Sequence, residues 1–359
     1  MTIRPTIVFT GGGTAGHVTP NIALIERFQQ ARWNIFYIGS KTGIEYQLIP
    51  KLGIKYYAIS TGKLRRYFSW QNFLDVFRIV IGICQAFFLL HHLRPRVIFS
   101  KGGFVAVPVV VGAWLNRIPA ISHESDVTLG LANKLLYPFV KKFCVTFKAS
   151  RIYFKNPSKC LVTGAPLRKN LYGDADRGYK ICGFSRDKKT ILIFGGSLGA
   201  EKINKIAREL LLKLLANFQV AHICGVGKID TKYNHVGYKQ FEYVNEEFGD
   251  LLACADLVIS RAGANTVFEL LALHKPNILI PLGLETSRGD QIANAEYAVA
   301  NGFSQMIPDA WLTVEVLRQK INWVMVHYDS VMINLLNFHA KDSVQIIYRL
   351  LLRYAGFKS

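Results

Sequence analysis

The 359-residue sequence contains no window of 18 or more uncharged apolar residues, which a membrane-spanning helix would need. The most apolar run, residues 79–90, is only 12 residues long and includes Gln85, so we interpret it as a buried or interfacial helix. The N-terminus passes directly into a strand and a glycine turn, without the apolar segment and cleavage site of a secretory signal. These absences predict a cytosolic chain.

The six cysteines lack a functional pattern. They are scattered at positions 84, 144, 160, 182, 224 and 254, without the paired spacing of a zinc site or a redox motif. We therefore expect reduced thiols in the core. A helix-turn-helix signal, an RNP-type aromatic run and a zinc module are also missing, so we expect no nucleic acid as a partner.

Acidic residues are scarce in the first half of the chain. Residues 1–166 hold 21 Lys and Arg against 5 Asp and Glu, whereas residues 167–359 hold 23 against 19. A half with this balance is attracted to an anionic membrane face or an anionic substrate. The length favours two domains, and the 50% apolar content argues against disorder.

Residues 257–271, which read LVISRAGANTVFELL, predict a strand, a polar turn and a helix. Free N–H groups at the start of such a helix favour an anion such as a pyrophosphate, and Arg261 adds a positive charge beside them. Glu269 lies a little over one turn inside the helix, where its carboxylate offers acceptors for two ribose hydroxyls. The pattern suits a nucleotide site, and it equally suits an ordinary strand–helix corner capped by Asn265.

A glycine-rich turn follows the first predicted strand. Residues 11–20 read GGGTAGHVTP and lead into a helix from about Asn21, and such glycines let the backbone approach a phosphate closely. A dinucleotide site needs an acidic residue at the end of the next strand, but Gly39 and Ser40 stand there, which argues against NAD. His17 is either a structural helix cap or a base, because imidazole titrates near neutral pH.

Further polar side chains follow the predicted strands 96–100 and 119–122. Because the carboxyl ends of parallel strands meet at one edge of a sheet, we expect these side chains to share a crevice with His17. They are Lys101, His123, Glu124, Asp126 and Asn133. Before these two strands, residues 61–77 place cations beside aromatic residues at helical spacing, which suits either a membrane surface or a helix packed on its own sheet.

The composition changes near residues 162–168, and we place the domain boundary after residue 165. A polar connector follows, in which Asp174 and Asp176 superficially resemble a DxD metal motif. That motif needs the end of a buried strand, so we expect no metal there.

The second half then repeats the order of strand, glycine turn and helix, with GGSLGA at residues 195–200. A later polar loop brings Asp290, Gln291 and Asn294 to the end of a strand, where they are suited to bind sugar hydroxyls. The final helix, from about residue 342, is expected to cross back and pack on the first domain.

With these pieces placed, the sequence resembles the MurG family, the UDP-N-acetylglucosamine:N-acetylmuramyl-(pentapeptide) pyrophosphoryl-undecaprenol N-acetylglucosamine transferases. The resemblance runs from about residue 6 to 305. It rests on the number and order of the motifs GGGTAGHVTP, SKGGF, HES, GLANK, TGAPLR, FGGSLGA, SRAGANTVFE and SRGDQIANA. The family implies an α/β fold of two Rossmann-like domains facing across a cleft, the glycosyltransferase B fold, without cofactor or catalytic metal.

The resemblance also implies roles for individual residues. UDP-GlcNAc would lie mainly on the second domain, and lipid I, undecaprenyl-pyrophosphoryl-MurNAc-pentapeptide, would approach the first at the cytoplasmic face of the bacterial plasma membrane. His17 and Glu124 would flank the reacting centre. The expected UDP-GlcNAc contacts are Thr14, Ala15, Gly16, Asp126, Arg168, Ser197, Asn245 near the uracil, Arg261, Gly263, Ala264, Asn265, Thr266, Val267, Phe268, Glu269, Asp290, Gln291 and Asn294. The expected acceptor contacts are Gly12, Gly13, Lys101, Gly102, Gly103, Phe104 and Asn133.

The sequence departs from the family pattern at three positions. The family commonly shows HEQN where this chain has HESD, so a contact usually made by Asn falls to Asp126. A Gln usual after GGS is Leu198, and a usual Tyr in the GGY turn is Phe104.

The expected reaction is an inverting transfer of GlcNAc to the C4 hydroxyl of MurNAc, with His17, or Glu124 directly or through water, as the base. It would convert lipid I to lipid II in peptidoglycan synthesis, at a peripheral membrane site. Three alternatives remain at this point. They are a related glycosyltransferase with another UDP-sugar or lipid acceptor, a non-hydrolysing UDP-GlcNAc epimerase, and a nucleotide-sugar-binding subunit without turnover.

Overall fold

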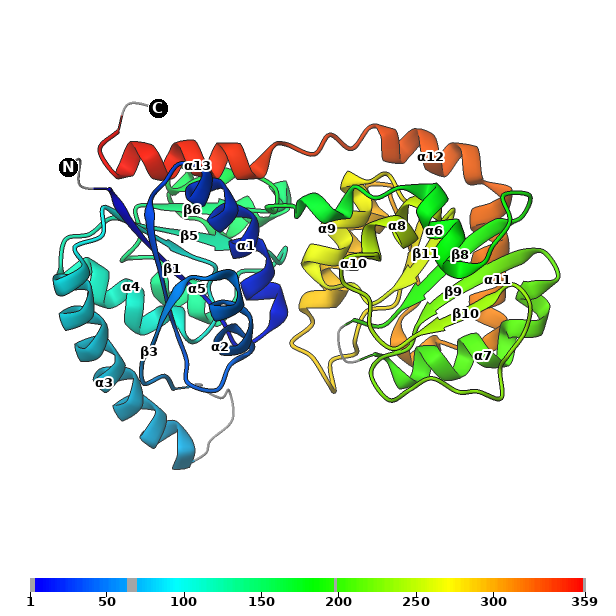
Figure 1. The fold of residues 1–359 in the computed structure, drawn as a ribbon, viewed down its shortest axis with the longest axis horizontal. Coiled ribbons are helices and arrows are strands. Elements are labelled where there is room, and N and C mark those ends of the chain that lie inside the picture. Colours follow the sequence, from blue (N-terminus) through cyan, green and yellow to red (C-terminus); the bar gives the residue numbers. More distant parts are fainter. Residues whose placement is uncertain (1–3, 63–69, 197–198, 358–359) are drawn as a thin grey trace. The chain divides into compact units, whose positions relative to one another are not determined.

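The computed structural model describes residues 4–62, 70–196 and 199–357, so Ser197, Leu198 and the basic and aromatic residues 63–69 lie outside the described residues. The chain divides into two compact units, which are each an α/β structure (Figure 1). The first unit comprises residues 1–168 and 341–359, and the second comprises residues 169–340. The division after Arg168 lies three residues beyond the expected boundary.

The first unit is built on a seven-stranded sheet in which all neighbouring strands are parallel. Its order is β3 (Lys55–Ala58), β2 (Asn34–Gly39), β1 (Thr6–Thr10), β4 (Val97–Ser100), β5 (Ala120–Glu124), β6 (Lys142–Val145) and β7 (Cys160–Val162). The central strands are continuous apolar runs because helices cover both of their faces. The chain order reverses between β1 and β4, and ligands of such sheets bind beyond the carboxyl ends at this switch point.

Two helical layers cover this sheet. The helices are α1 (Ala15–Gln30), α2 (Ile44–Leu48), α3 (Trp70–Leu93), α4 (Ala106–Leu115), α5 (Leu131–Leu136) and α13 (Ser343–Tyr354), with short 3-10 turns η1 (Pro50–Leu52), η2 (Lys148–Tyr153) and η3 (Pro157–Lys159). One core joins the sheet to α1 and α13, and the other joins it to α3, α4 and α5.

The last helix, α13, belongs to the first unit although it follows the whole of the second in the sequence. The ring of Tyr348 lies 4.9 Å from that of Phe28 on α1, and the guanidinium of Arg27 stacks on Tyr348 at 4.2 Å. Ser343 donates a hydrogen bond from its hydroxyl to the carbonyl of Thr163 at 2.7 Å. These contacts fix α13 on the layer formed by α1.

Two helices differ from the sequence-based expectation. Helix α1 begins at Ala15, six residues before Asn21, because Pro20 interrupts only the single backbone hydrogen bond to Gly16. Helix α3 runs from Trp70 to Leu93, twice the length of the apolar run. Residues 75–93 are long and apolar enough to cross a membrane by length and composition, although one such helix is weak evidence for a span. The predicted apolar run is shorter than this helix because Asp75 and Arg78 interrupt the first turns of α3.

The second unit contains a six-stranded parallel sheet. Its order is β10 (Tyr238–Phe241), β9 (Phe218–Ile223), β8 (Lys189–Phe194), β11 (Leu257–Ser260), β12 (Asn277–Leu279) and β13 (Gln305–Met306). The switch point here lies between β8 and β11. The sheet therefore brings the turn after β8 and the turn after β11 to one edge.

The helices of the second unit are α6 (Ala175–Cys182), α7 (Glu201–Leu215), α8 (Phe248–Cys254), α9 (Ala264–Ala272), α10 (Asp290–Ala300), α11 (Val314–Val326) and α12 (Tyr328–Leu336), with η4 (Lys169–Leu171) and η5 (Asp309–Trp311). Apolar faces of α7 and α11 share one core with the central strands. Both units thus have the Rossmann-like architecture that the sequence predicts.

Candidate active site

Two glycine turns pack against each other at the switch point of the first unit. A Cβ atom on Gly103 would lie 2.5 Å from the carbonyl oxygen of Gly12, and one on Gly13 would lie 2.6 Å from the ring of Phe104. Gly13, Gly102 and Gly103 also have positive φ angles, which glycine adopts without strain. The turns after β1 and β4 therefore need glycine for their own packing, whatever contact they make with an acceptor.

His17 is the third residue of α1, which directly follows the first glycine turn. Its Nδ1 atom is 3.0 Å from the hydroxyl of Thr14, and its side chain is half-buried. The extended backbone of Thr14 caps the helix, but its hydroxyl is bound to the imidazole instead of a backbone N–H. Thr14 therefore fixes the orientation of the His17 ring.

Glu124 ends β5 and is only 4% exposed. One carboxylate oxygen accepts from the backbone N–H groups of Ser125 at 2.9 Å and Asp126 at 3.2 Å. The other accepts from the N–H of Gly130 at 2.8 Å and the amide of Asn133 at 2.9 Å. With two donors on each oxygen the carboxylate is saturated, so the structure favours a role in holding the turn over the expected role as a base.

Lys101 is a second residue of the expected site. It is 1% exposed, and its ammonium group donates to Nδ1 of His123 at 2.7 Å and to the hydroxyl of Ser125. Burial lowers the pKa of Lys101 to about 8, although the nearby carboxylates of Glu124 and Asp126 oppose the change. The contacts of Lys101 are therefore made within the first unit, and the expected contact with an acceptor stays a prediction.

The other side of the same cluster is closed by His123. Its Nε2 atom lies 2.9 Å from the carbonyl of Gly164, which can only accept, so Nε2 carries the proton and Nδ1 accepts from Lys101. Burial, together with the charge of Lys101, holds the pKa of His123 well below its usual range. Asn133 is likewise buried and bonded to Ser122 as well as to Glu124, so its side chain holds the turn in place.

Glu45 is a residue of this site that the sequence analysis missed. It is fully buried and accepts from the backbone N–H of Gly13 at 3.1 Å and from the hydroxyl and N–H of Ser40 at 2.6 and 3.2 Å. It stands five residues beyond the position where a dinucleotide site carries its acid, so the spacing rule gave no signal. Its carboxylate is bound to the glycine turn and to Ser40, a different use from ribose binding.

In the second unit, the strand–turn–helix corner expected from the sequence is present. Strand β11 ends at Ser260, and α9 begins at Ala264 after an extended Gly263 that offers no side-chain cap. The first turn of α9 contains no acidic residue. The helix therefore keeps the N-terminal N–H groups and positive dipole end that favour an anion.

The side chains along α9 divide into two sets. Asn265, Thr266 and Glu269 are half-buried, whereas Val267 and Phe268 are 1% and 2% exposed and pack into the core. Val267 and Phe268 were both expected to contact UDP-GlcNAc. Their side chains instead pack in the core and anchor the helix. Any contact of α9 with a ligand would therefore be made by Asn265, Thr266 and Glu269 and by the backbone.

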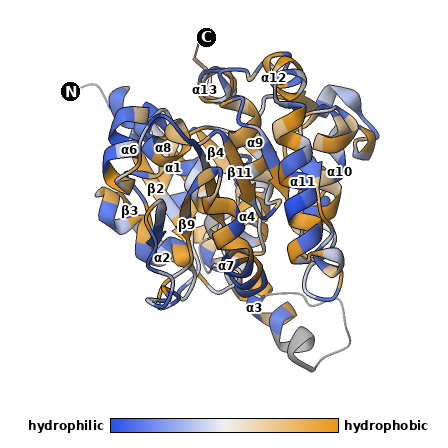
Figure 2. Ribbon diagram, turned by 90° about the vertical axis from the view of Figure 1, so that its right-hand side faces the viewer, coloured by the Kyte–Doolittle hydropathy of each residue, from blue (hydrophilic) through white to orange (hydrophobic). Residues whose placement is uncertain are grey.

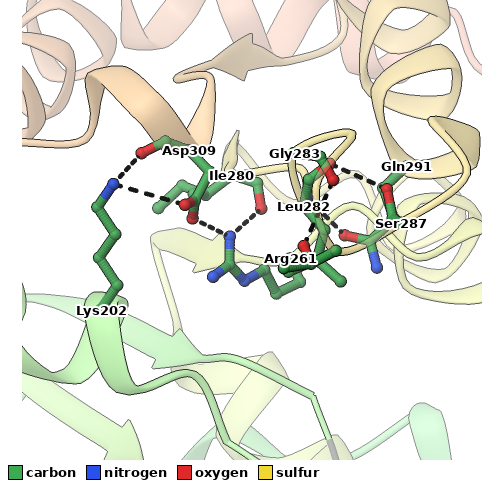
Figure 3. A network of polar contacts seen from close by, with 9 residues as sticks. Lys202, Arg261, Ile280, Leu282, Gly283, Ser287, Gln291 and Asp309 are labelled. Atoms are coloured by element: carbon green, nitrogen blue, oxygen red, sulfur yellow. Dashed lines mark hydrogen bonds and ion pairs between the residues drawn. The ribbon is translucent and has the colours of Figure 1, made fainter.

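Arg261 follows β11 and is held in place by other residues of the second unit (Figure 3). Its Nη1 atom donates to the carboxylate of Asp309 at 2.5 Å and to the carbonyl of Ile280 at 3.2 Å. Lys202, in the first turn of α7, lies 3.5 Å from the same carboxylate and also donates to the backbone carbonyl of Asp309. Burial opposes ionisation of Asp309, but Arg261 and Lys202 outweigh it and lower its pKa.

The loop and helix after β12 lie beside this corner. Gln291 accepts from the N–H of Leu282 at 3.1 Å, which closes the loop (Figure 3). Asp290 begins α10 and lies 3.8 Å from Arg288. Asn294 is fully buried and donates to the carbonyl of Ala262 at 3.2 Å. The Asn294 side chain therefore stabilises the turn that contains Arg261. The sequence had predicted that it binds sugar hydroxyls instead.

The remaining expected residues are more dispersed. Asn245 is exposed after β10, and its carbonyl accepts from Asn170 at 3.4 Å. Arg168 ends the first unit, with a buried Nε atom for which no partner occurs among the described residues. Asp174 caps α6, and Asp176 pairs with Arg186. Asp126 and Gly16 are half-buried in the first unit, where Ala15 starts α1.

Comparison with known proteins assigns the domains of both units to one family. Residues 7–145 match the glycosyltransferase family 28 N-terminal domain, and residues 190–343 match the family 28 C-terminal domain. A protein of Legionella pneumophila (strain Paris) named UDP-N-acetylglucosamine–N-acetylmuramyl-(pentapeptide) pyrophosphoryl-undecaprenol N-acetylglucosamine transferase is 54% identical over 331 residues, 92% of this chain and 91% of that protein. The chain belongs to the MurG family.

Other MurG relatives agree over the full length. The protein of the same name from Clostridium tetani is 47% identical over 359 residues, which cover 99% of this chain and all of that protein. The crystal structure of Acinetobacter baumannii MurG matches with a TM-score of 0.78 at 24% identity, over 97% of this chain and 99% of that one.

A second solved structure, the UDP-GlcNAc 2-epimerase from Neisseria meningitidis bound to UDP-GlcNAc, matches with a TM-score of 0.67 at 14% identity. It covers 98% of this chain and all of that one, and at this identity it shows the fold alone. The resemblance and the fold class expected from the sequence are confirmed, and this MurG-family chain is a glycosyltransferase of the B fold.

Proposed function

We propose that this glycosyltransferase transfers GlcNAc from UDP-GlcNAc to the C4 hydroxyl of MurNAc in lipid I, giving lipid II for peptidoglycan synthesis. The relatives at 47–54% identity carry the name of that transferase. The observation that carries the proposal is the corner formed by Arg261 and the start of α9, which joins a cation to a helix N-terminus without a nearby acid in the first turn. This combination binds the diphosphate of a nucleotide sugar.

The groups that bind the diphosphate would also stabilise the leaving group during the reaction. As the bond between the anomeric carbon and the diphosphate breaks, negative charge grows on the leaving UDP. Arg261 and the N–H groups of α9 are already oriented, since Asp309, Ile280 and Asn294 hold the turn. Preorganised donors of this kind are worth about 3–4 kcal/mol each in the transition state. Glu269, half-buried one turn further along α9, would accept from the ribose hydroxyls.

His17 is the base in this proposal. The C4 hydroxyl of MurNAc attacks the anomeric carbon from the face opposite UDP, Nε2 of His17 takes the hydroxyl proton, and UDP leaves with the bonding electron pair, so the configuration inverts. Thr14 holds the other ring nitrogen at 3.0 Å and thereby orients the imidazole. Glu124 is assigned a positioning role because its two oxygens already accept four hydrogen bonds.

The first unit would meet the lipid acceptor at an anionic membrane surface, as a peripheral protein on the cytoplasmic face. Helix α3 supports this. It is largely hydrophobic (Figure 2), and several of its apolar side chains are about half exposed or more. They are Val76 (50%), Phe77 (56%), Val80 (52%), Ile81 (51%) and Phe88 (70%). An exposed apolar stripe on a strongly basic unit is typical of a surface that inserts among lipid head groups.

The proposal is tested by incubating the full chain with UDP-GlcNAc and a short-chain lipid I analogue and measuring UDP release. Release must depend on the acceptor, and the product must carry one added GlcNAc. Conversion of UDP-GlcNAc in the absence of acceptor would instead identify an epimerase. Binding of UDP-GlcNAc without turnover under either condition would contradict the enzyme assignment.

A further inference from the structure

Asp309 joins the two strand–helix corners that flank the switch point of the second unit. Arg261 comes from the turn after β11, and Lys202 comes from the start of α7, which follows the glycine turn after β8. The Asp309 carboxylate lies 2.5 Å from Nη1 of Arg261 and 3.5 Å from Nζ of Lys202 (Figure 3). A single carboxylate therefore contacts cations from both corners.

The contacts of Arg261 show that it does not depend on Asp309 alone for its orientation. Nη1 also donates to the carbonyl of Ile280 at 3.2 Å, and the side chain is only 12% exposed. The Nε atom is buried and has no hydrogen-bond partner among the described residues. The backbone of Ile280 and the surrounding packing would hold the guanidinium near its present place without the carboxylate charge.

We propose that Asp309 lowers the affinity of the second unit for the nucleotide diphosphate by competing for Arg261 and Lys202. This inference rests on the proposed function, which puts the diphosphate at the Arg261 corner. The three side chains together carry one net positive charge, and neutralising the carboxylate would leave two. The competition serves turnover, because a standing intramolecular anion speeds the release of UDP after transfer.

The substitution Asp309→Asn isolates this effect. The amide oxygen still accepts from Arg261, while its NH2 group takes the place of the oxygen facing Lys202, which keeps its hydrogen bond to the backbone carbonyl of residue 309. Because Asp309 and Lys202 partly reach solvent, the gain is smaller than an unscreened charge would give, and we expect UDP to bind about tenfold more tightly. UMP, with one phosphate fewer, should gain less, and uridine should gain nothing.

The experiment is calorimetric titration of the full chain with UDP, UMP and uridine. Asp176→Asn serves as the matched control. It also removes a carboxylate that pairs with an arginine of the second unit, but Asp176 lies on α6, which precedes β8 in the chain. Asp309→Ala repeats the charge removal without an amide, and thermal melting without ligand verifies that each variant is folded.

The inference predicts tighter UDP binding in both Asp309 variants, unchanged binding in Asp176→Asn, and a smaller difference at high salt. Weaker or unchanged UDP binding in folded Asp309→Asn, or an equal gain for uridine, would overturn it. Failure of the unmodified protein to bind UDP would instead contradict the proposed function, so the two outcomes are distinguishable.

Discussion

The role of Glu124 can be decided by the substitution Glu124→Gln. The carboxylate accepts four hydrogen bonds, from three backbone N–H groups and the Asn133 amide. A glutamine has one acceptor oxygen and one NH2 group, so two of the four donors would face another donor. Hydrogen bonds to a charged group contribute about 1.5–3 kcal/mol each, so losing two destabilises the first unit by about 3 kcal/mol or more.

The measurement is thermal unfolding by calorimetry together with the transfer rate. For a unit of this size a loss of 1 kcal/mol lowers Tm by about 2–4 °C, so Glu124→Gln should melt about 6 °C or more below the unmodified protein. Glu26→Gln is the matched control, because Glu26 is exposed on α1 of the same unit, and it should leave both Tm and rate unchanged.

His17→Gln provides the contrast. Its side chain is half-buried and is bonded to Thr14 on the protein surface, so we expect a small change in Tm and a severe loss of transfer. The assignment of roles would be refuted if Glu124→Gln melted with the unmodified protein and still lost its transfer rate. In that case Glu124 would act on the substrate directly.

Two further outcomes follow from the first unit. Since the pKa of Lys101 is lowered to about 8 from its ordinary 10.5, the unfolded chain binds more protons between these values. The Lys101 contribution to the free energy of unfolding should therefore rise as the pH increases from about 8 to 10.5. Urea unfolding measured across this pH range should show the contribution in the unmodified protein and not in Lys101→Met. Gly103→Ala should cost more stability than Gly53→Ala, because both have positive φ but only Gly103 would place a Cβ against a backbone carbonyl, at 2.5 Å. Equal Tm values for the two alanine variants would contradict the packing of the glycine turns.

Local sequence patterns predicted the elements that carry the site. The glycine turns after β1 and β4 and the corner at β11 and α9 lie where the sequence placed them, because each is encoded by consecutive residues. The start of α1 was predicted six residues late, at about Asn21, but the helix begins at Ala15 and contains Pro20, whose missing N–H breaks only one bond. The sequence pattern could not show whether a polar side chain after a strand points into the protein interior or toward a ligand.

Lys101 and Asn294 illustrate that limit. Lys101 directly follows β4, and its N–H still pairs with Thr10, so the chain continues the strand for one residue and turns the side chain inward. Asn294 lies in α10, is fully buried and donates to the carbonyl of Ala262 in the turn after β11. Both residues stand where polar side chains of an α/β site are expected, and burial by distant segments decides their roles.

The pairing of Arg261 with Asp309 spans 48 residues, and no local signal in the sequence announces it. It depends on β13 joining the sheet edge beside β12, which then returns η5 toward the carboxyl end of β11. The two switch points therefore differ in the groups that bind their carboxylates, and the glycine motifs do not indicate this difference. In the first unit the carboxylates of Glu45 and Glu124 are bound mainly by backbone N–H groups and hold turns in place. In the second unit a carboxylate is bound by two cations, and this is the arrangement in which a diphosphate can take its place.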